Sequence, residues 1–168
     1  MDSKIQEMTA QEAVELVSSM IKLRYLAKAM DGQYRSNETI LSAGKLGTTM
    51  NGKPYEFTPD IIKKVESAIR ATGTLLINTR ILATPQSEEE YPLCYGEDYA
   101  SKFKVMRQAV VLSHIFITMM GKTVRWQKMR LNDKSEVKYY NKFTDEELDT
   151  INSCIHSIAL TLLSIKIV

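Results

Sequence analysis

Apolar residues recur at helical spacing in four stretches of the chain, and sequence signals for helix ends flank these stretches. The last stretch is the most regular, and its stripe consists of Leu148, Ile151, Ile155, Ile158, Leu162 and Ile165. It follows Thr144 and Glu147, whose spacing is that of the capping box that starts a helix. Because such stripes must be buried against one another, the sequence predicts a mainly α fold, a bundle of four main helices.

The first helix of this bundle is expected to begin at Thr9, with Glu12 completing a second capping box, and to end at the turn signal Asp31-Gly32. The second is expected to begin at Thr58-Pro59-Asp60. There a hydroxyl can cap the helix, a proline suits the first helical position and an acid faces the helix dipole. In its middle, Gly73 is either a close-packing point or a slight kink.

The third helix is expected over about Tyr99 to Met120, where apolar residues lie almost all round, so it should be the central helix of the core. Gly121 then fits a left-handed C-cap. The fourth helix should run from Thr144 to the C-terminus. Residues 32–57, rich in Gly, Ser, Thr and Asn, predict a loop-rich excursion with at most a short helical turn.

Length and composition are those of an ordinary globular chain. At 168 residues, 44% hydrophobic and 25% charged, it is long enough to bury a core, and we expect a single helical domain over 1–168. The two cysteines, Cys94 and Cys154, are too few for a disulfide scaffold. No apolar stretch is long enough to span a membrane and no signal peptide is visible, which predicts a cytoplasmic protein without membrane contact.

The segment 121–143 concentrates positive charge and aromatic rings between two apolar helical patterns. It carries seven bases against Asp133 and Glu136, a net charge of +5, whereas the rest of the chain, with 15 bases and 18 acids, has −3. Alternation around Asn132-Asp133 favours a basic hairpin or an irregular segment, and a helix continuing from 122 is the alternative. A polyanion would be drawn to this part of the chain first.

Lysine and arginine neutralise phosphates, and flat aromatic faces stack on unpaired bases, so the segment predicts contact with single-stranded nucleic acid, RNA being favoured. The candidate nucleic-acid-binding residues are Lys122, Arg125, Trp126, Lys128, Arg130, Lys134, Lys138, Tyr139, Tyr140 and Lys142. The alternative is a solvated segment whose aromatic rings pack back into the bundle while its lysines point to water.

Enzymatic chemistry finds little support in the sequence. The stretch Ser42–Thr49 resembles a phosphate-binding loop, but Thr39 replaces the leading glycine and Leu46 replaces the hydroxyl residue after the lysine. His114 and His156 lie in apolar helical patterns, which predicts core or groove positions rather than metal ligands. We therefore expect no enzyme, no catalytic residue, no metal and no cofactor.

The leading hypothesis is a non-enzymatic subunit of a larger assembly, in which several copies or other subunits line a single strand. In outline the predicted bundle is similar to the small helical subunits of RNA-guided defence complexes and to helical nucleoproteins; this is a likeness of fold only. The rival hypothesis is a protein-interaction or regulatory module of phage or host. In that case the acidic loop 84–98 and the basic segment 121–143 pair with complementary patches on neighbouring copies. An oligomeric binder of small anionic nucleotides is a third.

Overall fold

The computed structural model describes residues 4–131 and 142–168, and their secondary structure is almost entirely helical. The chain divides into two compact units. Unit 1 comprises residues 1–74 and 159–168, and unit 2 comprises residues 75–158. The division falls within the helices α4 (Pro59–Ile77) and α7 (Asp145–Ser164), so each of these helices contributes to both units. The prediction of one domain stays a prediction.

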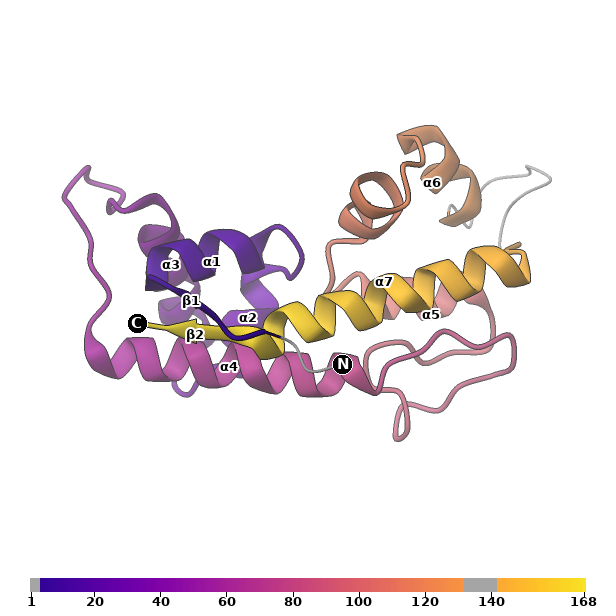
Figure 1. The fold of residues 1–168 in the computed structure, drawn as a ribbon, viewed down its shortest axis with the longest axis horizontal. Coiled ribbons are helices and arrows are strands. Elements are labelled where there is room, and N and C mark those ends of the chain that lie inside the picture. The colour runs from indigo at the N-terminus through magenta and orange to yellow at the C-terminus, as the bar shows by residue number, and fades with distance from the viewer. Residues whose placement is uncertain (1–3, 132–141) are drawn as a thin grey trace. The chain divides into compact units, whose positions relative to one another are not determined.

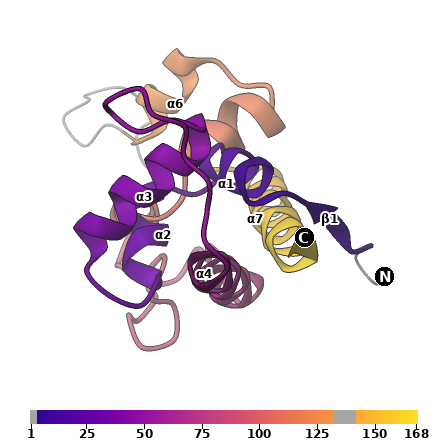
Figure 2. The same ribbon diagram turned by 90° about the vertical axis from the view of Figure 1, so that its left-hand side faces the viewer.

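Unit 1 contains three short helices, α1 (Ala10–Ser18), α2 (Leu23–Ala29) and α3 (Tyr34–Leu46), of which α3 contacts the other two (Figures 1 and 2). The capping box at Thr9 is confirmed, because the Glu12 amide donates to the Thr9 hydroxyl at 3.1 Å and Glu12 Oε1 accepts from the Thr9 amide at 3.1 Å. The core of the unit includes Val14, Val17, Leu26 and Leu41, none of which is exposed.

The expected first helix is broken into α1 and α2, so its prediction as one element was wrong. The hydroxyls of Ser18 and Ser19 donate to the carbonyls of Glu15 and Leu16, at 2.9 and 2.6 Å, and compete with the helix at this point. Lys22 then adopts an extended conformation before α2 begins. The break places Ile21 in the core, fully buried.

The expected loop 32–57 contains the 13-residue helix α3, so the prediction of at most a short helical turn there was wrong. Gly44, which suggested a break, lies inside this helix. A glycine is needed there because the ring of Phe57 occupies the space that a side chain would fill. A Cβ at Gly44 would lie only 1.7 Å from that ring. The helix ends at Gly47, whose φ of 77° is the left-handed conformation of a C-cap. Asn37 of α3 donates to the carbonyls of Ala27 and Asp31 near the end of α2, at 3.1 and 3.2 Å.

The long helices α4 and α7 begin as expected. The Ile61 amide donates to the Thr58 hydroxyl at 3.3 Å at the start of α4, and the capping box of Thr144 and Glu147 starts α7. Within unit 1, Gly73 is a close-packing point rather than a kink, because a Cβ there would lie 2.9 Å from Leu163 of α7.

The C-terminus is not helical to its end. Residues Ile165–Ile167 form the strand β2, which pairs in parallel with β1 (Gln6–Met8) in the register Gln6 with Ile165 and Met8 with Ile167. Isoleucine favours strands, and the alternation of buried, exposed and buried residues in β2 matches a strand with one covered face.

Unit 2 holds α5 (Tyr99–Met106), the π-helix η1 (His114–Met119), α6 (Val124–Leu131) and the greater part of α7 (Figure 1). The expected third helix is therefore interrupted at residues 107–111. Val110 and Val111 are β-branched, which weakens a helix, and the non-helical stretch buries Ala109 and Val110. Gly121, with a φ of 72°, follows η1 as expected of a C-cap glycine.

Candidate nucleic-acid interface

The basic segment contains a helix rather than the first strand of a hairpin. Residues Val124–Leu131 form α6, and the Thr123 hydroxyl accepts a hydrogen bond at 3.0 Å from the Trp126 amide in the first turn. Its Gln-Lys-Met-Arg-Leu sequence is made of good helix formers, which outweighs the alternation that suggested a strand. The Asn132-Asp133 turn and the rest of the expected hairpin, residues 132–141, lie outside the described residues.

Trp126 belongs to a continuous cluster of aromatic rings in unit 2. The ring centroids of Trp126 and Phe116 are 5.6 Å apart, and those of Trp126 and Phe143 are 6.2 Å apart. Phe143 in turn packs against Tyr99 and Phe103 of α5, at 5.2 Å in each case. These separations are typical of stabilising aromatic pairs. The cluster therefore joins α5, η1, α6 and the start of α7.

Two cations of the basic segment lie against the tryptophan ring. The Lys122 ammonium is 5.3 Å from the ring centroid and the Arg130 guanidinium carbon is 4.7 Å from it, both within the range of cation–π attraction. Residues 126 and 130 are four apart within α6, so helical geometry places them on one side, whereas Lys122 precedes the helix. Trp126 is thus half-buried, with protein groups already around its ring.

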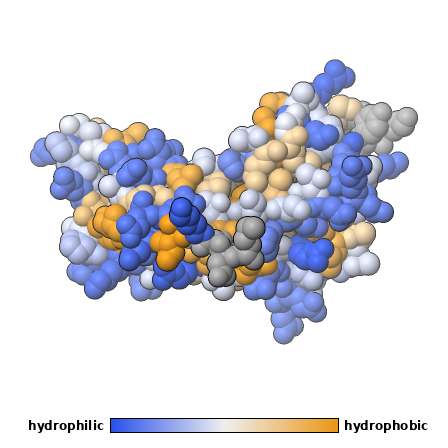
Figure 3. Space-filling view, in the orientation of Figure 1, coloured by the Kyte–Doolittle hydropathy of each residue, from blue (hydrophilic) through white to orange (hydrophobic). Residues whose placement is uncertain are grey.

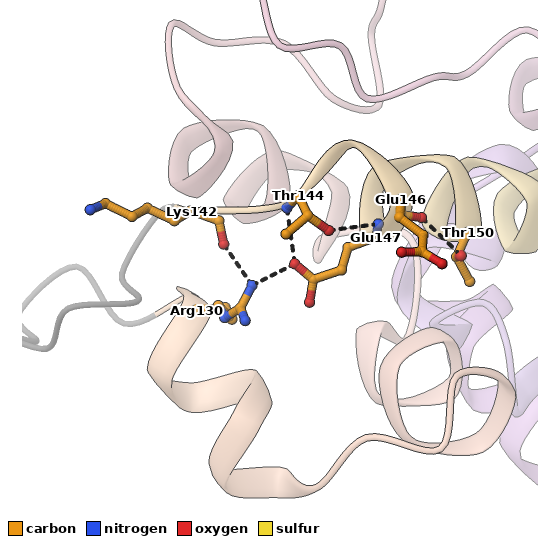
Figure 4. Close-up of polar contacts among 6 residues, drawn as sticks. All are labelled: Arg130, Lys142, Thr144, Glu146, Glu147 and Thr150. Carbon is orange, nitrogen blue, oxygen red and sulfur yellow. Dashed lines mark hydrogen bonds and ion pairs between the residues drawn. The ribbon is translucent and has the colours of Figure 1, made fainter.

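Arg130 is also held by an ion pair at the start of α7 (Figure 4). Its Nη1 donates to Glu147 Oε1 at 2.8 Å and to the Lys142 carbonyl at 2.7 Å. The same Glu147 oxygen accepts from the Thr144 amide at 2.9 Å, so one carboxylate completes the capping box and anchors α6. The two side chains are only 14% and 16% exposed, which makes this a largely shielded ion pair.

The carboxyl group of Glu147 responds to these contacts. Burial alone would raise its pKa, but the hydrogen bonds from Thr144 and from the Arg130 guanidinium outweigh burial and hold the pKa below its ordinary value of 4.5. Glu147 is therefore charged at neutral pH, as the ion pair with Arg130 requires.

Three of the remaining described bases of the segment face solvent. Arg125, Lys128 and Lys142 are exposed, Lys122 is half-buried, and within the described part of the chain none of these four side chains forms an ion pair. Figure 3 shows hydrophilic residues around α6 beside paler, less polar ones. Four further candidates, Lys134, Lys138, Tyr139 and Tyr140, lie outside the described residues. The structure thus separates Trp126 and Arg130, which pack internally, from cations at the surface.

A buried lysine that the sequence analysis missed organises the acidic loop of unit 2. Lys102 is fully buried, and its ammonium donates to the carbonyls of Leu82 and Thr84, each at 2.6 Å. Burial lowers the pKa of this group. The available signal was its spacing: Lys102 lies three residues after Tyr99 and four before Met106, on the apolar stripe of α5. A lysine on such a stripe must find acceptors in the interior.

Gln86 also holds this loop in place through hydrogen bonds. Its side-chain amide donates to the Arg80 carbonyl at 2.7 Å and accepts from the Leu82 amide at 2.8 Å, while its backbone pairs with Gly96 across the loop. Cys94 is buried beside it, and burial raises the pKa of this thiol to about 11, so it is protonated and unreactive at neutral pH. Glu88, Glu89 and Glu90 remain exposed.

The other candidate chemistry is not assembled in the described residues. Ser42–Leu46 belong to the last turns of α3, and a helix C-terminus presents carbonyls rather than the amides that bind phosphate. His114 is half-buried and burial lowers its pKa, whereas His156 is exposed, which contradicts the core alternative of its predicted core or groove position. Among the residues that the structure describes, no cluster of three metal-ligating side chains occurs, and no helix is long and apolar enough to cross a membrane.

Comparison with protein-family models, with curated proteins and with solved structures finds no significant match to this chain.

Proposed function

We propose that this protein contacts single-stranded nucleic acid, with RNA favoured, through the solvent-exposed side of α6, as a non-enzymatic subunit of a larger assembly. The observation that supports this most directly is the set of exposed cations without acidic partners in the described residues: Arg125, Lys128 and Lys142. Three such charges on a short stretch suit the phosphates of a flexible strand, and a second copy of the chain would multiply their effect.

The contacts of Trp126 and Arg130 refine their roles in this proposal. Arg130 is occupied by Glu147 and the Lys142 carbonyl, and Trp126 by the aromatic cluster, so they hold α6 in place. Arg125 and Lys128 are three residues apart on the helix and therefore point to the same side. They are the residues that we assign to phosphate contact, together with Lys142.

The test is the anisotropy of a labelled oligouridylate titrated with protein at several salt concentrations. Wild-type protein should bind at low salt. The slope of log affinity against log salt should reach about 0.7 per phosphate contact, so Arg125→Glu with Lys128→Glu should remove about 1.4 of it. Because both side chains are exposed, circular dichroism and the melting temperature should not change.

Lys104→Glu with Arg107→Glu is the matched control, because these two bases have the same spacing, lie in the same unit and are exposed. Binding by this control should equal that of the wild type. Equal loss in both double variants would show a response to overall charge and contradict a site on α6. Absence of binding by wild-type protein at low salt would favour the protein-interaction hypothesis.

A further inference from the structure

A second basic region lies in unit 1, whereas the residues assigned above belong to unit 2. Between residues 22 and 53 the chain carries six bases, Lys22, Arg24, Lys28, Arg35, Lys45 and Lys53, against two acids, Asp31 and Glu38, a net charge of +4. Because these bases are spread over three elements, no single short segment of the sequence shows the excess.

Some of these bases lie beside an open groove of about 910 Å³, a volume within the range of small-molecule sites. It is lined by residues of α2, of α3 and of the turn that follows α3. Among them are Arg24, Tyr34, Arg35, Leu46, Thr49 and Met50. All belong to unit 1, so the groove is formed within one compact unit.

The walls of the groove are tied together by specific contacts. Arg24 of α2 forms an ion pair with Glu38 of α3, with Nε and Oε2 3.5 Å apart. The turn after α3 is closed by the Thr49 amide, which donates to the Lys53 carbonyl at 2.8 Å, and by the Tyr55 amide, which donates to the Gly47 carbonyl at 2.9 Å. The groove is therefore a built feature of the fold rather than a gap between loose segments.

Its lining combines exposed apolar side chains with cations. Leu46 is 70% exposed, Met50 is 99% exposed and Tyr34 is 37% exposed, so three of the larger exposed apolar side chains gather at one place. Apolar side chains beside cations suit a ligand that has both an apolar and an anionic part. The ammonium of Lys28 and the guanidinium of Arg35 lie 5.3 and 5.9 Å from the centroid of the Tyr34 ring.

We propose that this groove binds a nucleotide, a ligand that unites a flat apolar base with a phosphate. The base would pack against Tyr34, Leu46 and Met50, and the phosphate would pair with Arg35 at the rim, because Arg24 is already paired with Glu38. Guanidinium groups match phosphate oxygens in geometry and charge. Both a free mononucleotide and a nucleotide within an RNA strand carry this chemistry.

The experiment measures the anisotropy of N-methylanthraniloyl-ATP titrated with full-length protein. We expect saturable binding that AMP competes for more strongly than adenosine or inorganic phosphate, because each of these lacks one half of the ligand. Arg35→Glu and Met50→Asp should each weaken binding roughly tenfold or more, since they place an acid where the phosphate or the base lies. Both side chains are exposed, so the variants should fold normally.

Lys64→Glu is the control, because Lys64 is exposed in the same unit but does not line the groove. Its affinity should match that of the wild type. A probe that shows no saturable binding at millimolar protein, or affinities in Arg35→Glu and Met50→Asp equal to that of Lys64→Glu, would overturn the proposal.

The source of the nucleotide is distinguished in the Arg125→Glu, Lys128→Glu background, which lacks the cations proposed for α6. Displacement of the probe there by a short oligouridylate identifies a nucleotide within RNA. Displacement by AMP but not by the oligouridylate identifies a free nucleotide. Because the groove lies in unit 1 and α6 in unit 2, either site can fail this test without the other.

Discussion

Bases of one short segment have different roles, and a single residue shows why. Arg130 lies two positions after Lys128, yet its guanidinium is held by Glu147 and the Lys142 carbonyl, whereas the Lys128 side chain faces solvent. The planar guanidinium can satisfy two acceptors and also cover the Trp126 ring, which an ammonium could not do with the same geometry. The number of bases in a segment therefore overstates the charge available to a ligand.

Arg130→Ala is expected to lower the free energy of unfolding by about 2 kcal/mol, because it leaves the shielded Glu147 carboxylate without its charged partner. Lys128→Ala, the matched control on the same helix, should change it by about 0.5 kcal/mol or less. Urea denaturation followed by circular dichroism measures both. A double variant that adds Glu147→Gln should recover part of the loss, and an Arg130→Ala protein as stable as the wild type would show that the ion pair contributes nothing.

At the scale of the elements, the alternating burial in the terminal strand β2 predicts which substitutions there destabilise the protein. Ile165 is 2% exposed and Lys166 faces solvent, although they are neighbours. Ile165→Asp should destabilise the protein by about 3 kcal/mol or more, because an unpaired carboxylate replaces a buried side chain. Lys166→Asp should have little effect. Thermal melts measure both variants. Ile167→Asp separates the strand from a continued helix, because Ile165 and Ile167 share the covered face of β2 but would lie on different faces of a helix.

How far the elements could be predicted depended on whether their signals were local. The capping boxes at Thr9 and Thr144, and the Thr58-Pro59 start of α4, are set by residues close in sequence, and all three are confirmed. The helix α3 was not predicted because glycine usually interrupts helices, and the reason for Gly44, its contact with the Phe57 ring, is visible only in the folded structure. The pairing of β1 with β2 joins residues far apart in sequence, which no local pattern reveals.

The candidate site was predicted in the same uneven way. The position of the basic segment and the concentration of cations in it could be read from composition. That Arg130 is taken up by Glu147, and that Trp126 packs on Phe116, depend on contacts between elements and could not be read in this way. The cations of unit 1 were missed for the same reason, because folding rather than sequence brings Arg24 and Arg35 to one groove.

For the whole molecule, acid is expected to destabilise both units. Hydrogen bonds from Thr9 lower the pKa of Glu12 in unit 1. In unit 2, hydrogen bonds from Ser101 lower that of Asp98, and the contacts with Thr144 and Arg130 lower that of Glu147. A carboxyl group with a lowered pKa stabilises the fold above its unfolded pKa, and this stabilisation is lost as pH falls. Burial lowers the pKa of His114 from 6.5, which adds a smaller loss below that value.

The melting temperature should therefore decline modestly as pH falls below 6.5 and steeply below about 4.5, the ordinary pKa of glutamate. Thermal melts between pH 7 and pH 3 measure this. Glu147→Gln should flatten the steep part of the curve, whereas Glu146→Gln, at the exposed neighbouring position, should leave it unchanged. A melting temperature that is constant down to pH 3 would contradict the charged state assigned to these carboxylates.

The composition of unit 1 also has a consequence for how the chain folds as it is synthesised. Its first 74 residues leave the ribosome early, but its remaining part, residues 159–168, is made only after the whole of unit 2. Nascent chains usually complete their domains from the N-terminus onward. Here the second unit in sequence can be complete first, while unit 1 still lacks β2, the strand that contacts α1 and pairs with β1. We therefore expect residues 1–74 to be the part of the nascent chain that a ribosome-bound chaperone binds for the longest time.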